Sequence, residues 1–447
     1  MQTSFTEQQL ARPEIRQADG ILRTCVHYGF CTATCPTYVL FRDENDSPRG
    51  RIDLIRAMLE KGGAPERKTV HHLDRCLSCL SCVTTCAVKV DYTHLIDIAR
   101  TYIEKHYQRP LGERMLRLML AKTLPYPRRF AAAMRFAKLV RPFESLLPKR
   151  LANLVQLAQR EARTEFVSPR VFPAAGARRL RVLLLAGCAQ QALDGEINAA
   201  TIRVLTRHGC EVVIAEGAGC CGALPLHMGR EEEGRALARK NVASWARVQD
   251  VDAMVVNASG CGTTVKDYGH LLETEDGKRI GAMTRDVTEI LESLDLQVKN
   301  DKYYRVAYHD ACSLQHGQRV MAPPRDLLTK AGFEVVDLPE RHFCCGSAGT
   351  YNLLQPQIAE TLGQRKASHA ESLDPDFIAA GNLGCMVQIG RYTKLPVLHT
   401  VSLIDWATGG PLPAALRGVN LREPQPKPKA VEVTAGATAP SGDSGFW

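Results

Sequence analysis

The sequence contains 447 residues, of which 45% are hydrophobic, and it carries a formal net charge of +9 at neutral pH. This length predicts two or three domains. No apolar run approaches the ~20 residues that a membrane-spanning helix needs, and the basic charge comes without the aromatic platform or recognition helix of a nucleic-acid-binding protein. Residues 1–24 include charged side chains and no apolar stretch of the kind found in secretion signals, so a cytoplasmic protein is expected.

Seven cysteines form two tight runs near the N-terminus. The second run has the spacing C-x2-C-x2-C-x3-C, with which bacterial ferredoxins hold a [4Fe–4S] cluster. Zinc sites instead favour two well-separated pairs of ligands, and structural disulfides need an oxidising compartment. We therefore predict an iron–sulfur protein that carries electrons, with these metal ligands: Cys25, Cys31, Cys35, Cys76, Cys79, Cys82 and Cys86.

The two runs are expected to share their ligands between two sites. In two-cluster ferredoxins the fourth cysteine of each run binds the other cluster. One site then takes Cys76, Cys79, Cys82 and Cys35 and holds a complete [4Fe–4S] cluster. The other site lacks one thiolate, because Tyr28 stands at the position of the second ligand in the first run. With Cys25, Cys31 and Cys86 alone, this incomplete site could hold a [3Fe–4S] cluster, a [4Fe–4S] cluster with a non-cysteine fourth ligand, or no stable cluster.

A strongly basic segment follows between Arg109 and Arg163, with thirteen Lys or Arg residues against three Glu. Apolar residues recur in it at helical spacing, which predicts basic amphipathic helices. Three interpretations are open: a helical linker packed on its own protein, a surface that docks an acidic partner, or a surface that lies on an anionic membrane. The apolar residues are Met115, Leu116, Met119, Leu120, Phe130, Met134, Ala137 and Leu139.

The second half of the chain contains a duplication. Each cysteine of one set lies 124 positions before its counterpart in the other, and both sets contain a Cys-Cys-Gly motif. In each copy, expected strands alternate with helical stretches, which predicts an α/β fold with parallel sheets. The strands are expected at 180–186, 211–215 and 253–257 in the first copy and at 304–308, 334–338 and 377–380 in the second. The cysteines should converge at the carboxyl ends of the strands. They are Cys188, Cys220, Cys221 and Cys261, then Cys312, Cys344, Cys345 and Cys385.

These eight cysteines are candidate metal or redox sites. A further iron–sulfur cluster, zinc or a redox-active dithiol would each suit four thiols at the ends of strands. Gly222 and Gly346 are expected to let the backbone turn tightly past each site.

The chain resembles a family of iron–sulfur subunits that includes those of bacterial glycolate oxidase, anaerobic glycerol-3-phosphate dehydrogenase, lactate-utilisation proteins and heterodisulfide reductase. The resemblance rests on the segments 21–38, 46–52 and 72–76 and on the paired Cys-Cys-Gly repeats. It implies a helical-ferredoxin-type N-terminal domain for two clusters, with a helix near 51–61 between the cysteine runs, followed by a duplicated α/β Cys-Cys-Gly domain. Three positions depart from the family pattern: Tyr28 replaces a cysteine, and Thr264 and Gln388 stand where some members end each repeat with a further thiolate.

The resemblance also implies a function. The chain would carry electrons from FAD-containing subunits that oxidise glycolate to glyoxylate, or D-lactate to pyruvate, to a quinone or another acceptor. No flavin or nicotinamide fingerprint is present, so no catalytic residue for the substrate is expected in this chain. The alternatives are the same role for glycerol-3-phosphate or lactate, and a heterodisulfide-reductase-like thiol–disulfide enzyme.

Any contact with the cytoplasmic face of the inner membrane is expected to be peripheral. The expected organisation of the chain has five parts. The parts are a ferredoxin-type domain over 1–108, a basic helical linker over 109–178, two Cys-Cys-Gly domains over 179–295 and 296–408, and a disordered tail over 409–447.

Overall fold

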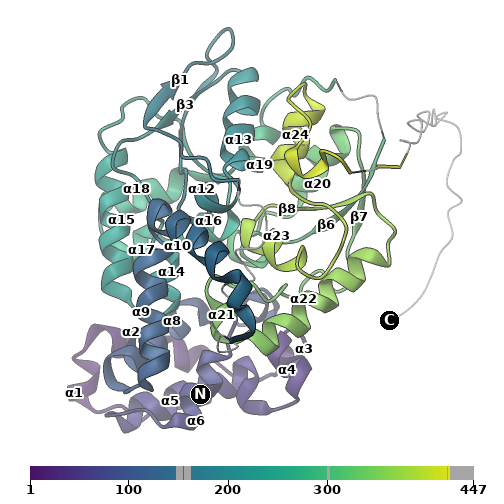
Figure 1. The fold of residues 1–447 in the computed structure, drawn as a ribbon. Helices are drawn as coiled ribbons and strands as arrows, with labels where there is room; N and C mark the ends of the chain where they lie inside the picture. Colours follow the sequence, from purple (N-terminus) through teal and green to yellow (C-terminus); the bar gives the residue numbers. More distant parts are fainter. Residues whose placement is uncertain (147–154, 156–162, 300–302, 420, 423–447) are drawn as a thin grey trace, which may run out of the picture.

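The computed structural model describes residues 1–146, 155, 163–299, 303–419 and 421–422. A helical N-terminal region lies below two α/β units, which stand side by side in Figure 1. Most of the predicted tail, over 423–447, and the linker residues 147–154 and 156–162 lie outside the described residues. The predicted fold class, a helical N-terminal domain followed by duplicated α/β domains, is confirmed.

The N-terminal region is built only of helices and connecting loops in its described residues. Proline occupies the first turn of α2, α4 and α5, where its missing N–H costs no hydrogen bond. Apolar side chains such as Ile15, Leu22 and Ile55 form its core. The helices are α1 (Glu7–Leu10), α2 (Pro13–Thr24), α3 (Phe30–Ala33), α4 (Pro36–Phe41), the 3₁₀ turn η1 (Glu44–Asp46), α5 (Pro48–Lys61), α6 (Arg67–Asp74), α7 (Ser81–Thr85) and α8 (Tyr92–His106).

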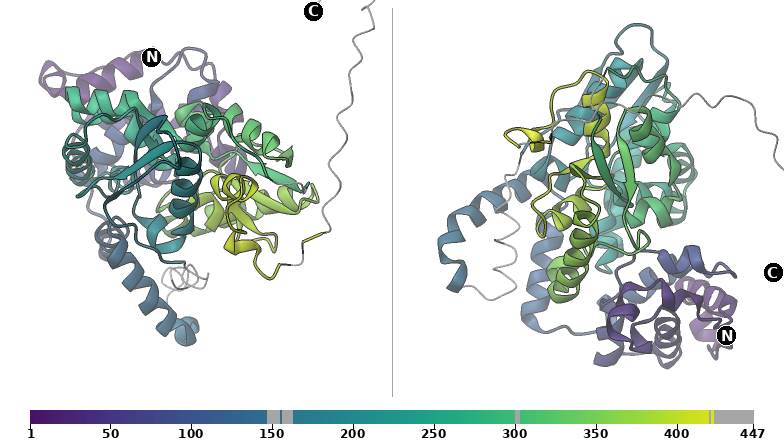
Figure 2. Two further views of the ribbon diagram at one scale, coloured as in Figure 1. Left: turned by 90° about the horizontal axis from the view of Figure 1, so that it is seen from above. Right: turned by 90° about the vertical axis from the view of Figure 1, so that its right-hand side faces the viewer.

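The basic segment forms α9 (Leu111–Thr123), α10 (Pro127–Val140) and the turn η2 (Arg141–Leu146). In both views of Figure 2, α10 extends away from the body of the protein. Leu116 and Leu120 of the predicted apolar stripe are buried against Met228 and Leu353. Met134 of the stripe is also buried, Phe130 and Ala137 are half-buried, and Met115, Met119 and Leu139 are exposed. Among the described residues, no helix combines the length and the apolar composition needed to cross a bilayer.

The first Cys-Cys-Gly domain contains a five-stranded sheet in the order β1-β3-β2-β4-β5. Its strands are β1 (Arg170–Phe172), β2 (Leu180–Leu184), β3 (Cys210–Ile214), β4 (Ala253–Val256) and β5 (Thr284–Asp286). All neighbours are parallel except β1, which pairs antiparallel with β3. Helices α12 (Ala189–Leu193), α13 (Glu196–Arg207), α14 (Ala223–His227), α15 (Glu231–Trp245), α16 (Ser259–Lys266), α17 (Tyr268–Leu272), α18 (Glu275–Met283) and α19 (Val287–Glu292) surround it.

The second domain contains a parallel sheet in the order β7-β6-β8-β9. Its strands are β6 (Arg305–His309), β7 (Glu334–Asp337), β8 (Phe377–Ala380) and β9 (Val397–His399). Its helices are the π-helical turn η3 (Ser313–Gln318), α20 (Ala322–Lys330), α21 (Tyr351–Leu354), α22 (Pro356–Glu371), α23 (Leu383–Ile389) and α24 (Thr400–Ala407), and the turn η4 (Ala414–Leu416) follows.

Two boundaries differ from those expected. Strand β1 lies inside the linker predicted over 109–178, because its backbone pairs with the free edge of β3 and extends the first sheet. Part of the tail predicted over 409–447 is folded: Leu416 is buried, and the N–H of Ala414 donates to the Glu196 carboxylate of the first domain.

The two Cys-Cys-Gly domains share one hydrophobic core, to which β2 and β6 both contribute. A buried carboxylate joins them at its edge. Asp405 on α24 is 1% exposed and pairs with Arg203 at 2.7 Å and Arg207 at 3.0 Å, both on α13. The relative placement of the two domains therefore depends on charges as well as on apolar packing.

Replacement of Asp405 by Ala should destabilise the protein by about 1.5–3 kcal/mol, because it removes charge-assisted contacts to two arginines whose side chains stay partly exposed to water. Denaturant unfolding followed by circular dichroism measures this change. Asp374 is the matched control, because both side chains of its ion pair with Arg422 are exposed to water. Replacement of Asp374 by Ala should change stability little. Equal effects of the two substitutions would contradict this account.

Candidate metal centres

The first N-terminal site gathers Cys35 with the first three cysteines of the second run. Cys35 precedes α4, and Cys76 and Cys79 lie in the loop between α6 and α7. The Cys82 thiol on α7 lies within electrostatic reach of Cys79, Cys76 and Cys35. Burial, together with these neighbouring thiols, raises the pKa of Cys82 well above its usual value. Crowded, buried thiols of this kind ionise readily only when a cation is bound among them.

Two arginines lie beside this group of thiols. Arg51 is almost completely buried, and its guanidinium approaches the Cys35 sulfur at 3.8 Å. Arg100 donates to the carbonyl of Cys76 at 2.7 Å. Burial alone would raise the pKa of Cys76, but Arg51 and Arg100 outweigh it and lower that pKa. The site can therefore stabilise the negative charge of bound thiolates.

Arg51 is itself held by a buried network. Its side chain donates to the carbonyl of His72 and to the hydroxyl of Thr37 and pairs with Asp46. Asp46 is fully buried and also contacts Arg75 at 2.6 Å. Because its carboxylate is shared between these cations, Asp46 serves to hold the loops of the site.

The predicted ligands of the second N-terminal site, Cys25, Cys31 and Cys86, line a small cavity of about 50 Å³, and Cys82, predicted for the first site, lines it as well. Burial raises the pKa of Cys31 to about 11. The side chain of Tyr28 is 70% exposed and stacks on Phe30 with ring centroids 6.2 Å apart. In this conformation Tyr28 stands at the rim of the site and does not complete the set of thiols.

The four cysteines of the first copy follow three strands, as predicted. Cys188 comes after β2, Cys220 and Cys221 after β3, and Cys261 lies on α16 after β4. Successive thiols in this order lie close enough to shift one another's pKa. Contact with Cys220 and burial hold the pKa of Cys188 well above its usual value.

The second copy repeats this arrangement. Cys312 comes after β6, Cys344 and Cys345 after β7, and Cys385 lies on α23 after β8. Contacts again run from Cys312 to Cys344, Cys345 and Cys385.

The Cys-Cys-Gly motif turns in the same way in both copies. Gly222 and Gly346 have φ of 93° and 88°, and a Cβ atom at either position would lie 2.7 Å from a backbone oxygen. Each glycine also donates its N–H to the sulfur two residues earlier, at 3.5 Å to Cys220 and 3.4 Å to Cys344. A side chain at either position would therefore move a sulfur and the N–H that stabilises it.

Both copies face a single cavity of about 300 Å³. All eight cysteines of the duplication line it, together with Cys76 and Cys79 of the N-terminal region. Leu77, next to these two, packs against Cys312 and Cys344, and Tyr351 donates to the carbonyl of Arg75 at 2.9 Å. The loop that carries Cys76 and Cys79 thus lies directly against the second copy.

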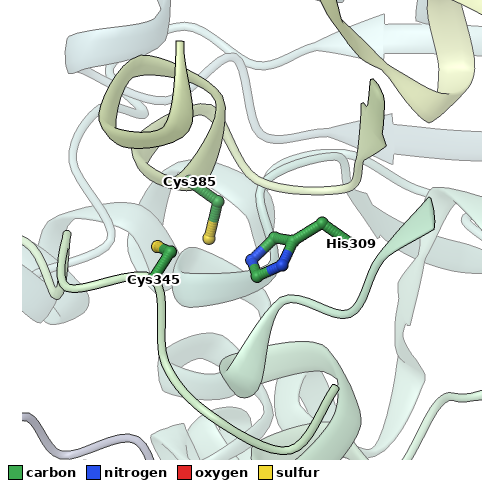
Figure 3. Close-up of side chains that lie close together, drawn as sticks. All are labelled: His309, Cys345 and Cys385. Atoms are coloured by element: carbon green, nitrogen blue, oxygen red, sulfur yellow. The ribbon is translucent and has the colours of Figure 1, made fainter. Parts of the chain in front are cut away.

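Sequence reasoning missed two groups beside the second copy. His309, the last residue of β6, points at Cys345 and Cys385 in Figure 3. The ammonium of Lys366 on α22 lies near Cys312, Cys345 and Cys344 and donates to the carbonyl of Glu340 at 2.6 Å. Burial and the charge of Lys366 lower the pKa of His309 to about 3, so the imidazole is neutral. Alignment of the two copies at their 124-residue offset would have revealed both residues. The first copy has the apolar residues Leu185 and Val242 at the equivalent positions, so a histidine and a lysine stand out in the second copy.

Comparisons with known proteins agree with this architecture. The 4Fe-4S dicluster domain family matches residues 24–90, and the Cysteine-rich domain family matches residues 182–266 and 306–390. These matches support iron–sulfur clusters as the cofactors. A crystal structure of a hypothetical protein from Helicobacter pylori has the same fold, with a TM-score of 0.52, 10% sequence identity and coverage of 93% of this chain and 76% of that chain.

Three relatives show how far the similarity extends. The glycolate oxidase iron-sulfur subunit of Escherichia coli is 40% identical and covers 91% of this chain and 99% of its own length. The probable glycolate oxidase iron-sulfur subunit of Bacillus subtilis is 30% identical, over 88% and 96% of the two chains. Lactate utilization protein A of Geobacillus kaustophilus is 28% identical over 51% of this chain and 99% of its own. This chain therefore belongs to the family of glycolate oxidase iron–sulfur subunits, and it is an iron–sulfur electron-transfer subunit of an oxidoreductase complex.

Proposed function

We propose that this subunit takes electrons from an FAD-containing partner that oxidises glycolate to glyoxylate and passes them to a quinone or another acceptor. The names of the two relatives that cover nearly the whole chain support the substrate. One structural observation carries the electron path: cysteines of the N-terminal region and of both Cys-Cys-Gly copies line one cavity. D-Lactate, oxidised to pyruvate, is the second candidate substrate, because the chain is also similar to a lactate utilization protein.

The path would begin at the site of Cys25, Cys31 and Cys86. Its rim carries exposed apolar side chains, among them Val26, which is 52% exposed, and Phe30, which is 63% exposed. Apolar side chains exposed around a cofactor site are typical of a docking surface. We place the contact with the flavoprotein there, since a flavin must come close to the first cluster to transfer an electron.

From this site the electrons would pass to the cluster ligated by Cys35, Cys76, Cys79 and Cys82. The Cys79 thiol lies within electrostatic reach of Cys312, so the next step leads into the second Cys-Cys-Gly copy. The clusters supply the redox chemistry. The protein supplies their spacing, their burial and positive groups such as Arg51 and Arg100.

The basic helices offer a separate surface. On α10 and η2, the exposed apolar side chains Phe136, Leu139, Phe143 and Leu146 lie among basic residues. This composition supports peripheral contact with an anionic membrane, at which a quinone acceptor would be reached, or with an acidic subunit of the complex. A cytoplasmic location fits both contacts.

A heterodisulfide-reductase-like activity is the alternative from a different class. It would place the chemistry at the Cys-Cys-Gly sites and would let the isolated chain turn over a disulfide substrate. The positions of the further thiolate are occupied by Thr264 and Gln388 in this chain, which favours electron transfer over this alternative.

Replacement of Cys35 by Ser should remove the same cluster as replacement of Cys79 by Ser, because both would bind one cluster across the two runs. Each variant should lose about four iron atoms per chain. Anaerobic iron and sulfide analysis with electron paramagnetic resonance measures the loss. Cys210, a fully buried cysteine in β3, is the control, and its replacement by Ser should leave the clusters unchanged. A full cluster signal in the Cys35→Ser variant would refute the crossed assignment.

Replacement of Tyr28 by Cys tests the incomplete site. Since the Tyr28 side chain lies at the rim, three thiolates remain, and we expect the oxidised wild-type protein to show a [3Fe–4S] signal. The added thiolate should convert it to a reducible [4Fe–4S] cluster with one more iron and a lower potential, because it adds anionic charge. Spectra and iron content before and after the substitution measure this. A [4Fe–4S] cluster already present in the wild type would mean that another group fills the fourth corner.

Glycolate should reduce the clusters when the chain is mixed with its flavoprotein and should not reduce them in the isolated chain. The Phe30→Glu substitution should lower the rate of reduction about 10-fold or more at limiting concentration, because it places a charge in the proposed docking surface. Stopped-flow absorbance of the clusters measures the rate. Leu139→Glu, on the basic helices, is the control and should retain the wild-type rate. Reduction of the isolated chain by glycolate would contradict the proposed role.

A further inference from the structure

The two Cys-Cys-Gly copies have the same cysteines but different surroundings. His309 and Lys366 stand beside the thiols of the second copy, and the residues 124 positions earlier are Leu185 and Val242. Leu185 and Val242 are both buried apolar side chains. The duplication has thus kept the four thiols and changed two side chains that could interact with a bound metal.

The environment of His309 is that of an unused ligand. The residue is completely buried, and neither ring nitrogen has a hydrogen-bond partner within the part of the chain that the structure describes. Buried imidazole nitrogens are normally paired. One ring nitrogen and the sulfurs of Cys345 and Cys385 all lie within 4.8 Å of one another (Figure 3). Nitrogen and sulfur atoms bound to one tetrahedral metal are separated by about 3.5–4 Å, given bond lengths of about 2.0 and 2.3 Å, so a small contraction would bring all three onto one metal.

The number of donors distinguishes between metals. A single zinc ion takes four ligands. Here Cys344 and Cys312 continue the series of contacting thiols from Cys345, so five donors are available with His309. A centre with more than one metal uses them better, and the iron–sulfur family to which the chain belongs favours iron as that metal.

We propose that His309, with Cys345 and Cys385, ligates one iron of an iron–sulfur centre in the second copy, whereas the centre of the first copy is ligated by thiolates alone. The proposal rests on the proposed electron-transfer function. A neutral imidazole in place of a thiolate lowers the negative charge on a cluster, and histidine ligands raise the potential of iron–sulfur centres in this way. The nearby ammonium of Lys366 acts in the same direction.

The consequence is a direction for electron flow. One electron leaves the cluster of Cys35, Cys76, Cys79 and Cys82, which is oxidised, and reduces the centre of the second copy by one electron. Because Cys79 lies near Cys312, this transfer spans neighbouring groups. The higher potential would hold the electron at the cavity that both copies share.

The direct test is pulsed electron paramagnetic resonance on the full chain, purified anaerobically and reduced chemically. The wild type should show strong coupling of one cluster to a histidine nitrogen. In a His309→Cys variant the iron content should be unchanged, the nitrogen coupling should be lost and the midpoint potential of that centre should shift downward. His342, half-buried two residues before Cys344, provides the control, and His342→Leu should keep both the coupling and the potential.

A second variant covers a failure of His309→Cys to fold. His309→Leu carries the residue that the first copy already accommodates at this position, and it should lose the nitrogen coupling, with or without loss of the iron of that centre. Wild-type coupling that persists in either variant would overturn the proposal, and so would zinc in place of iron at the second copy. Because the reductant is chemical, this test does not depend on the proposed substrate. Glycolate could fail to reduce the complex although His309 is a ligand, and glycolate could reduce the complex although His309 is not a ligand.

Discussion

Cluster-binding thiols must be brought close together and kept from water, and this requirement determines where the parts of the protein meet. The loop with Cys76 and Cys79 packs against the second Cys-Cys-Gly copy through Leu77 and through the hydrogen bond from Tyr351 to Arg75. The carboxyl ends of two parallel sheets bring eight further cysteines to the same cavity. In open parallel sheets, ligands commonly bind in the crevice outside the carboxyl ends of the strands. The shared core of the two copies and the buried pairing of Asp405 with α13 fix that edge in place.

Charge compensation recurs around the thiols. Arg51 and Arg100 lie beside the N-terminal cluster site, and Lys366 lies beside the second copy. Each added thiolate makes a cluster harder to reduce, and each buried cation makes it easier. In the first copy, the apolar residue Val242 stands at the position that corresponds to Lys366, and Leu185 at the position that corresponds to His309. The duplication therefore supplies two sites of similar shape whose potentials the surrounding side chains can set separately.

Much of this arrangement could be predicted from the sequence, because the signals are local or strictly repeated. The C-x2-C-x2-C-x3-C spacing indicated the N-terminal clusters, and the constant 124-residue offset placed each Cys-Cys-Gly cysteine at the end of a strand. Contacts between distant segments could not be predicted in this way. The shared cavity depends on how the 75–79 loop packs on the second copy, and the exposure of Tyr28 depends on the conformation of one loop. Strand β1 has only three residues, which is too short to show the alternating pattern by which a strand is predicted, so its pairing with β3 could not be foreseen. In the sequence His309 looks like an ordinary core histidine. Only the structure shows that its two ring nitrogens have no hydrogen-bond partner among the described residues and that the ring lies beside Cys345 and Cys385.

The central claim is that the N-terminal cluster and the centre of the second copy are neighbours in one electron path. Magnetic interaction between two reduced centres falls steeply with distance, so pulsed electron paramagnetic resonance of the fully reduced chain measures this most directly. The account predicts that the cluster of Cys35, Cys76, Cys79 and Cys82 is magnetically coupled to a centre whose signal disappears when Cys312 is replaced by Ser. Relaxation and line shape of the N-terminal cluster that do not change when Cys312 is replaced would show that the two centres are not neighbours, and would contradict the account.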